Sequence, residues 1–384
     1  MAWLAAFRSL HEPPPSFGDE GRLFAVSGVW PGSSDVTVET VSSLDEVRAE
    51  WSELATATKN VFSTWEWAST WWQHFGENRR LLLRAGRDET ARIDVILPLY
   101  LWSERPLRCA RFLGHGPADQ LGPVCRSPDV ERAAAMLRRV VADADLDLLL
   151  AELLPGGIGW STGLARRRQL RESSPLAVLG EGWNAYLETR SANLRHQIRR
   201  RERRLRDRHQ VRFRLTEDRR RLADDMTLLF SLHRARWPDG ASAFTRWESF
   251  HRDFAALAME RGWLRLWFLE VDGCAAAAWY GFRYAGVESY YQAGRDPARG
   301  DDSVGFVLLA HSIREAATDG MLEYRLLRGA EQFKLRFATG DRGLETFAIA
   351  RGAKGAIAGW VSWPALRSAR GRRLLRAFRG SGSR

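Results

Sequence analysis

The order of residues over 264–334 constrains the fold of this chain more than any other feature. Alternating apolar residues predict three strands, at 264–271, 275–284 and 288–292. A polar loop from Arg295 to Gly305 then runs directly into the apolar helix expected over 304–317. The start of a helix offers unpaired backbone N–H groups and a partial positive charge. A loop of this kind therefore predicts a phosphate site, with Arg295 beside it.

The same order of elements occurs twice along the chain. A hairpin, a further strand, a helix and a short strand are expected within residues 81–150, and the order returns within 264–326. The offset is about 180 residues, too long for a solenoid repeat and suitable for two copies of one domain. We predict an α/β (α+β, mixed-sheet) protein in four parts: a disordered or loosely attached extension over 1–34, domains over 35–178 and 179–350, and a basic tail over 351–384.

Composition excludes several classes of protein. A content of 45% hydrophobic and 27% charged residues is usual for a soluble globular chain. Cys109, Cys125 and Cys274 lack partner spacing, which predicts a reducing compartment, no disulfide frame and no metal site. No run reaches the roughly 18 apolar residues of a membrane span. The N-terminus lacks a basic start before an apolar block, so we expect no secretory signal and a cytoplasmic protein.

The net charge of +11 is concentrated in two segments. Residues 195–221 and 351–384 each carry +9, which leaves −7 for the remainder. The pattern indicates a mildly acidic body with two basic attachments. The first could bind RNA phosphates, an anionic glycan or lipid headgroups, or could be a solvated helix face. In the second, the apolar stretch 356–363 precedes arginines, so 356–384 is a candidate for peripheral contact with the inner face of the membrane, the alternative being a solvated tail.

This arrangement resembles a known family. One strand, two helices, a three-strand meander, a phosphate loop opening a helix and a further strand resemble the GNAT acyltransferase fold. The second half resembles the CelD-like or BioF2-like acetyltransferase domain, a relative of the FemAB aminoacyltransferases. The resemblance covers about residues 36–350 and implies two tandem GNAT-like domains. The segments that carry it are 191–195, 232–237, 268–273, 296–305 and 325–334 in the second half, and 62–72 and 112–123 in the first.

The resemblance implies acetyl-CoA or another acyl-CoA as co-substrate and no metal. The loop before the helix would hold its pyrophosphate, with Ser303 and Gly305 offering N–H groups and glycine allowing close approach. A solvated loop is the alternative. The residues predicted to bind the cofactor are Gln292, Arg295, Arg299, Ser303, Val304 and Gly305.

Three residues are predicted to be catalytic. Tyr290 could protonate the leaving thiolate, and strand alternation places Tyr290 and Gln292 on one face with Tyr291 on the other. His233 or Glu270 could take the proton from the acceptor. The alternatives are core aromatic side chains and a helix-packing histidine.

Four further residues are predicted to bind the acceptor. Asp119, an additional candidate base, lies in a first-half loop expected to face a cleft between the domains. Trp237 is four residues after His233, and Arg328 and Lys334 could hold an anionic part of a ligand. The resemblance implies acyl transfer to a small-molecule or glycan acceptor in polysaccharide or envelope biosynthesis. A FemAB-like enzyme using aminoacyl-tRNA and a non-catalytic scaffold of a polysaccharide machine remain alternatives.

Overall fold

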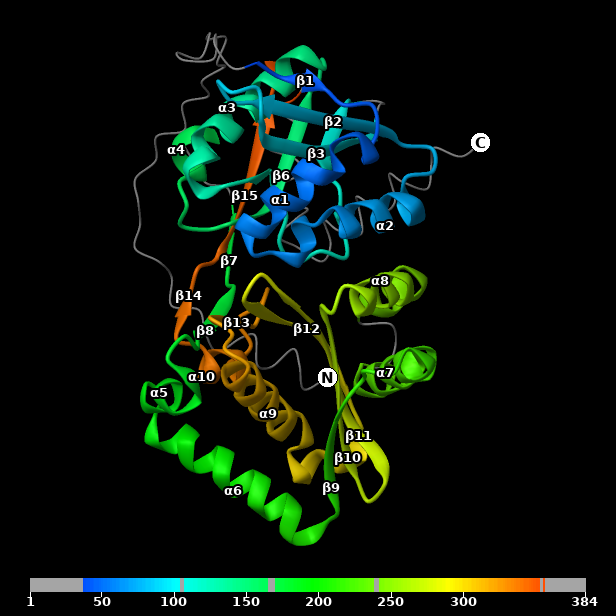
Figure 1. Ribbon diagram of the computed structural model, residues 1–384, viewed down its shortest axis with the longest axis vertical. Coiled ribbons are helices and arrows are strands. Elements are labelled where there is room, and N and C mark those ends of the chain that lie inside the picture. Colours follow the sequence, from blue (N-terminus) through cyan, green and yellow to red (C-terminus); the bar gives the residue numbers. More distant parts are fainter. Residues whose placement is uncertain (1–36, 104–106, 165–169, 238–241, 353–354, 356–384) are drawn as a thin grey trace, which may run out of the picture. The chain divides into compact units, whose positions relative to one another are not determined.

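The computed structural model describes residues 37–103, 107–164, 170–237, 242–352 and 355 (Figure 1). The predicted N-terminal extension and the segment 356–384, with its predicted membrane contact, lie outside the described residues. Within the described residues the chain forms two mixed β-sheets with helices packed on them. The predicted α/β, mixed-sheet class is confirmed.

The first sheet is built mainly from the first half of the chain. Its strand order is β1-β2-β3-β4-β6-β15-β7, with β5 paired to β3. The strands are β1 Glu39–Thr40, β2 Arg80–Arg87, β3 Ile93–Ser103, β4 Cys109–Phe112, β5 Val124–Cys125, β6 Leu148–Pro155, β7 Leu170–Glu172 and β15 Leu344–Ala350. The accompanying helices are α1 Arg48–Thr58, α2 Trp65–Phe75, α3 Val130–Asp143 and α4 Trp160–Leu164.

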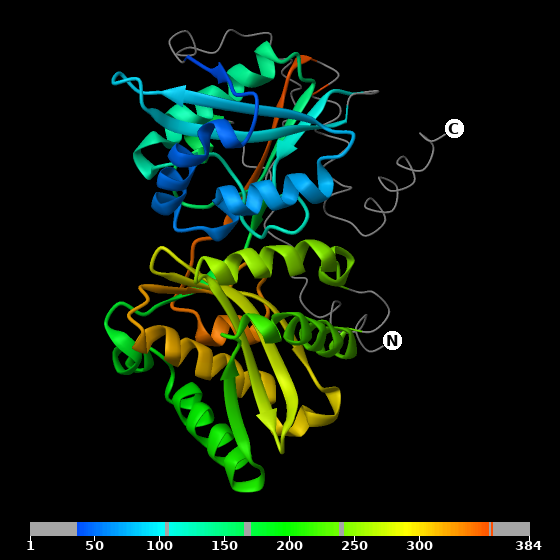
Figure 2. The same cartoon turned by 45° about the vertical axis from the view of Figure 1, so that its right-hand side comes forward.

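The second sheet has the order β14-β8-β13-β12-β11-β10-β9. Its strands are β8 Pro175–Val178, β9 Val211–Leu215, β10 Leu264–Val271, β11 Cys274–Tyr284, β12 Val287–Arg295, β13 Glu323–Arg325 and β14 Gly340–Asp341. Its helices are α5 Gly182–Glu188, α6 Ala192–Arg208, α7 Leu222–Arg236, α8 Glu248–Glu260, α9 Val304–Thr318 and α10 Gln332–Phe337. Helices α7 and α8 cover one face of β10–β12, and α9 covers the other, as both views show (Figures 1 and 2).

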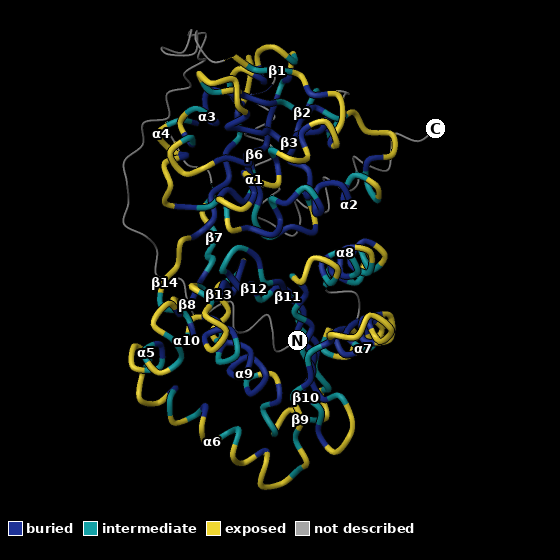
Figure 3. Tube along the Cα trace, viewed as in Figure 1, coloured by how far each residue is buried: buried dark blue, intermediate teal, exposed yellow. Residues whose placement is uncertain are grey.

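Local sequence explains the elements that carry the site. The β10–β11 turn uses Asp272 and Gly273, whose φ values of 53° and 82° are those of a type I′ hairpin turn. Helix α6 begins where the Ser191 side chain accepts a hydrogen bond from the Leu194 amide at 3.2 Å. Leu194, Ile198 and Leu205 form its buried stripe, while most of its arginines are exposed (Figure 3).

The chain passes between the two sheets more than once. Strand β8 enters the second sheet beside β13, and β15 returns from the second half to pair antiparallel with β6 of the first sheet. The predicted boundary between residues 178 and 179 stays a prediction. The pairing of β15 adds a connection that local strand patterns did not indicate, because register between distant strands is a long-range property.

The second sheet separates two hydrophobic clusters. Successive residues of β11 alternate between them, so Tyr280 and Phe282 belong to the cluster that continues into the first sheet, while Trp279 belongs to the cluster beneath α9. The larger cluster joins the two halves of the chain. The ring centroids of Phe62, from the first half, and Phe282, from the second, are 6.5 Å apart. The phenol of Tyr291 donates a 2.6 Å hydrogen bond to the Pro117 carbonyl across the same boundary. The loop that holds Asp119 is thereby fixed against β12.

None of the described helices is both long enough and apolar enough to span a membrane.

Candidate active site

A cavity of about 270 Å³ opens at the start of α9. Ser303 precedes the helix in the left-handed conformation, with φ of 56°. Its carbonyl accepts the amides of Phe306 and Val307, and no side chain caps the helix. The amides of Val304 and Gly305 are therefore at the helix start without a side-chain cap, beside the cavity that Ser303 and Gly305 line. The Ser303 amide, which was predicted to bind phosphate, is not free to do so, because it donates to the Gly300 carbonyl at 3.3 Å.

The described lining of this cavity is basic. Arg201, Arg236 and Arg295 line it, and no carboxylate is among its lining residues. The Arg201 guanidinium donates to the Ser303 hydroxyl at 3.2 Å and lies 4.5 Å from the Phe306 ring centroid. Burial lowers the pKa of Arg201 from its ordinary value, and Arg336 adds to that shift. An anion placed here would relieve the repulsion between these cations.

Sequence reasoning missed Arg201. It lies on the Arg-rich helix α6, whose many arginines look alike in the charge pattern of the sequence. The signal was its spacing: Arg201 falls three residues after Ile198 and four before Leu205, on the same stripe that is buried. An arginine on the apolar stripe of a helix is directed at the protein, and that position separates Arg201 from its exposed neighbours.

Strand β12 separates from its parallel neighbour beside this cavity. It pairs with β13 only from Val287 to Ser289 and then continues alone on that side to Arg295. Opposite β11, Tyr290 aligns with Gly281 and Gln292 with Tyr280, so Tyr291 is an extra, bulged residue. On that side, the stretch of β12 from Tyr290 to Arg295 therefore has no β13 partner.

The bulge changes which side chains share a face. Tyr290 packs with the cluster beneath α9 and lines the cavity. Gln292 is paired with Tyr280 of the other cluster, so the predicted common face of Tyr290 and Gln292 is wrong. Burial raises the pKa of Tyr290 above its ordinary value, while nearby Arg236 opposes the shift. Tyr290 is therefore a protonated phenol near neutral pH.

A second group of predicted residues comes together where the Asp119 loop meets the end of β13. Burial raises the pKa of Asp119 to about 6, and nearby Lys334 and then Arg328 act in the opposite direction. Lys334 Nζ donates to the Arg328 carbonyl at 2.5 Å and lies 3.0 Å from the Glu331 carboxylate. Arg328 is paired with Glu172 at 2.5 Å. The structure thus places three predicted acceptor-binding residues in one electrostatic cluster.

Other predicted residues lie elsewhere. The His233 ring bonds the Ala293 carbonyl at 2.9 Å, and burial lowers its pKa to about 4, so it is neutral and packed between α7 and β12. Glu270 pairs with Arg214 at 2.7 Å within a buried network. Arg299 pairs with two carboxylates rather than lining the cavity.

Two further predicted positions have mixed outcomes. Val304 is fully buried, so its side chain belongs to the core and only its amide lies at the helix start. Trp237 is 39% exposed at the end of α7 and lines neither of the cavities described in this structure. Within the described residues no cluster of His, Cys, Asp or Glu could hold a metal ion.

An uncapped helix start on a basic cavity, beside a strand that parts from its parallel neighbour, forms a site suited to an anionic group. The family comparison names the class of domain that carries this site. Residues 192–335 match the acetyltransferase (GNAT) domain family, and this stretch runs from α6 into α10 and includes most of the cavity lining. The predicted GNAT-type domain is confirmed for this part of the chain. No curated protein matches the chain.

Solved structures extend the likeness to both halves. FemX shares 10% identity, covers 82% of this chain and 95% of its own, with a TM-score of 0.57. A conserved protein of unknown function from Bacteroides thetaiotaomicron VPI-5482 shares 13% identity over 82% of this chain and 100% of its own, with a TM-score of 0.52. The C-terminal domain of a putative lysylphosphatidylglycerol synthetase from Agrobacterium fabrum shares 12% identity. The match covers 82% of this chain and 95% of that domain, with a TM-score of 0.51. At these identities the likeness shows a shared fold.

Proposed function

We propose that this protein is an acyltransferase that moves an acyl group from an acyl-CoA to an amine or hydroxyl of an acceptor. The observation that carries the proposal is the uncapped start of α9 on a cavity lined by three arginines and no carboxylate. The amides of Val304 and Gly305, with Arg201 and Arg295, would hold the diphosphate. The cavity is smaller than a whole coenzyme, so the nucleotide would remain outside it.

The aromatic wall of the cavity would guide the rest of the donor. Trp279, Tyr290, Phe306 and Phe333 line it, and the rings of Trp279 and Tyr290 are stacked with centroids 6.0 Å apart. An apolar passage next to the open edge of β12 suits the pantetheine arm, and exposed backbone N–H groups there could polarise a carbonyl. The donor supplies an acyl group activated as a thioester, whose transfer releases a thiolate.

Two side chains are placed to move protons. The Tyr290 phenol is protonated and lies in the donor cavity, so its hydroxyl can donate to a leaving sulfur. We assign the base to Asp119 rather than His233, because Asp119 lies in the cluster with Lys334 and Arg328, whereas the His233 ring is already bonded to the Ala293 carbonyl and burial lowers its pKa to about 4. A carboxylate with a pKa of about 6 is mostly ionised at neutral pH yet basic enough to accept a proton from an attacking amine.

Titration with acetyl-CoA tests the donor site. We expect Arg201→Gln to weaken acetyl-CoA binding about 10- to 100-fold, because a charge-assisted hydrogen bond is worth roughly 1.5–3 kcal/mol. Arg200→Gln is the matched control, since Arg200 is the adjacent, exposed residue of α6 and does not line the cavity. Binding is read by calorimetry and by the thermal shift. Equal affinity in the parent and Arg201→Gln would remove the basis of the proposal.

The same pair of variants tests the second candidate, an aminoacyl-tRNA user. The observation that favours it is the exposed arginine face of α6. Phosphate contacts on that face would make the Arg200→Gln variant lose RNA affinity and reduce the salt dependence of binding. A chain that is stabilised by RNA in an Arg200-dependent way, and not by acetyl-CoA, would support this candidate.

The pH dependence of the rate tests Asp119. Only the carboxylate can accept a proton, and burial raises its pKa to about 6 from 3.8. The rate of transfer should therefore fall as pH decreases through about 6, by about tenfold per pH unit below it. The sign for stability is opposite: the raised pKa means that the folded state holds this proton more tightly, so the contribution of Asp119 to stability decreases as pH rises from about 4 to 6.

Asp119→Asn separates these effects. We expect it to lower the rate about 10²- to 10⁴-fold, to abolish the acidic limb of the pH profile and to leave acetyl-CoA affinity unchanged. An unchanged acidic limb in this variant would assign the base to another group.

A further inference from the structure

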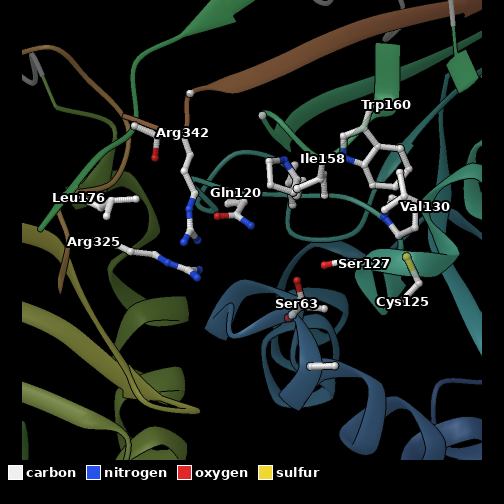
Figure 4. A pocket seen from close by; sticks show the side chains of 18 residues that line it. Ser63, Gln120, Cys125, Ser127, Val130, Ile158, Trp160, Leu176, Arg325 and Arg342 are labelled. Carbon is white, nitrogen blue, oxygen red and sulfur yellow. The ribbon is translucent and has the colours of Figure 1, made fainter. Parts of the chain in front are cut away.

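A second cavity, of about 380 Å³, has walls from both halves of the chain (Figure 4). It shares no lining residue with the donor cavity at α9. Its volume is within the range of small-molecule sites. The proposed reaction assigns it no role so far.

One end of this cavity is cationic. Arg325 and Arg342 bring their guanidinium groups together there (Figure 4). Arg325 is only 9% exposed, donates to the Lys59 carbonyl at 2.8 Å and pairs with Glu323 at 3.2 Å. Arg342 pairs with the same Glu323. Among the described ion pairs, two guanidinium groups thus share one carboxylate, and burial together with Arg342 lowers the pKa of Arg325. A second anion at this end would balance the charge.

The other end is apolar. Val130, Ile158 and Trp160 line it, together with Cys125, whose pKa is raised to about 12 by burial, so that its thiol stays neutral. Trp160 is 2% exposed, and its indole N–H is buried without a hydrogen-bond partner in the described structure. A buried N–H of this kind costs free energy unless an acceptor reaches it. The cavity therefore combines a charged end with an apolar wall.

The position of this cavity relates it to the reaction. Arg325 is opposite Ser289, the last pair before β12 and β13 separate. Tyr324 faces α9, where it bonds Ser312, so its neighbour Arg325 faces the other side of the sheet. The donor cavity is on the α9 side. Gln120, the residue after Asp119, lines the second cavity. Through Gln120 the second cavity reaches the chain neighbour of the proposed base, and Arg325 places it on the side of the sheet opposite the donor cavity.

We propose that this cavity binds the acceptor, and that the acceptor carries an anionic group, either carboxylate or phosphate, joined to an apolar portion. The anion would lie between Arg325 and Arg342, and the apolar portion along Ile158 and Trp160. The role of the ligand as acceptor rests on the proposed acyltransferase function. Its chemical class follows from the residues that line the cavity.

Calorimetry on the whole chain tests the ligand class with four probes: octanoate, octyl phosphate, octanol and inorganic phosphate. We expect octanoate or octyl phosphate to bind at least about tenfold more tightly than octanol and inorganic phosphate. Octanol lacks the anionic group, and inorganic phosphate lacks the apolar chain. Comparing octanoate with octyl phosphate distinguishes a carboxylate from a phosphate ligand. Equal weak binding of all four probes would overturn the proposal.

Variants locate the binding. Arg342→Gln and Ile158→Asp change partly exposed side chains at the two ends of the cavity and should each weaken the best probe about tenfold or more. Arg219→Gln is the matched control. Arg219 is an exposed arginine that pairs with one glutamate, Glu260, and it does not line this cavity. Probe binding that is the same in Arg342→Gln as in Arg219→Gln would contradict the proposal.

The acetyl-CoA titration of the same proteins keeps the two proposals separate. Arg342→Gln should bind acetyl-CoA as the parent does, since the two cavities share no residue. Normal acetyl-CoA binding with no probe binding overturns the acceptor site and leaves the acyltransferase proposal. Arginine-dependent probe binding without any acetyl-CoA binding overturns the acyltransferase proposal and supports the ligand class of this cavity.

Discussion

A Gly305→Asp protein should fold at least as stably as the parent and bind acetyl-CoA about 100-fold more weakly. Gly305 is exposed in the first turn of α9, and a Cβ there would meet Arg295 Cδ no closer than 3.7 Å, so a side chain has room. A carboxylate in the first turn of a helix is stabilising by about 0.3–1 kcal/mol. The same carboxylate would occupy the place of the phosphate, pair with the cavity arginines and repel the donor.

The comparison that isolates charge is Gly305→Asn, which has nearly the same size and no charge. We expect Asn to reduce affinity several-fold less than Asp, whereas the thermal midpoint should be higher for Asp than for Asn. Calorimetry measures the affinity and thermal unfolding measures stability. If both variants bind acetyl-CoA equally well, the helix start does not hold the diphosphate.

A Tyr290→Phe protein should transfer the acyl group about 10²- to 10⁴-fold more slowly at unchanged acetyl-CoA affinity. General acid catalysis by a positioned group contributes about this much. The phenylalanine keeps the ring that stacks on Trp279 and contacts Phe333, and it removes only the hydroxyl. The expected loss is therefore in kcat and not in donor binding.

Tyr324→Phe is the matched control for this variant. Tyr324 is also a buried tyrosine of the same sheet, facing α9, but its hydroxyl bonds Ser312 and does not line the cavity. Its loss should cost about 0.5–1.5 kcal/mol of stability with little change in rate. Rates within about twofold of each other for the two variants would exclude the Tyr290 phenol as the acid.

Local sequence patterns predicted much of the second half. The predicted strand over 264–271 has the bounds of β10, and the helix expected over 304–317 is α9 with one residue added. Both succeeded because alternation and apolar runs are local signals. The uncapped start of α9 was predictable for the same reason, since a polar loop entering a helix needs no distant partner to leave its first amides open.

Distant partners account for what local patterns could not show. The bulge at Tyr291 arises from pairing with β11 and moves Gln292 to the opposite face. Arg299 lies in the predicted loop, but it forms an ion pair with Asp272 of the β10–β11 hairpin, 27 residues earlier in the chain. Asp119 and Lys334 are the reverse case, because they come from different halves of the chain and the fold brings Lys334 close enough to lower the pKa of Asp119.

Because β15 returns to pair with β6 of the first sheet, neither half of the chain is an independent folding unit. A fragment ending after β8 would lack β15 and leave one edge of β6 open, with unpaired backbone groups that favour association with other chains. A fragment beginning after β7 would carry a β15 with no β6 to receive it. Domain-swapping or truncation designs based on this chain would therefore have to transplant β15 together with the first half, by circular permutation or by an added strand.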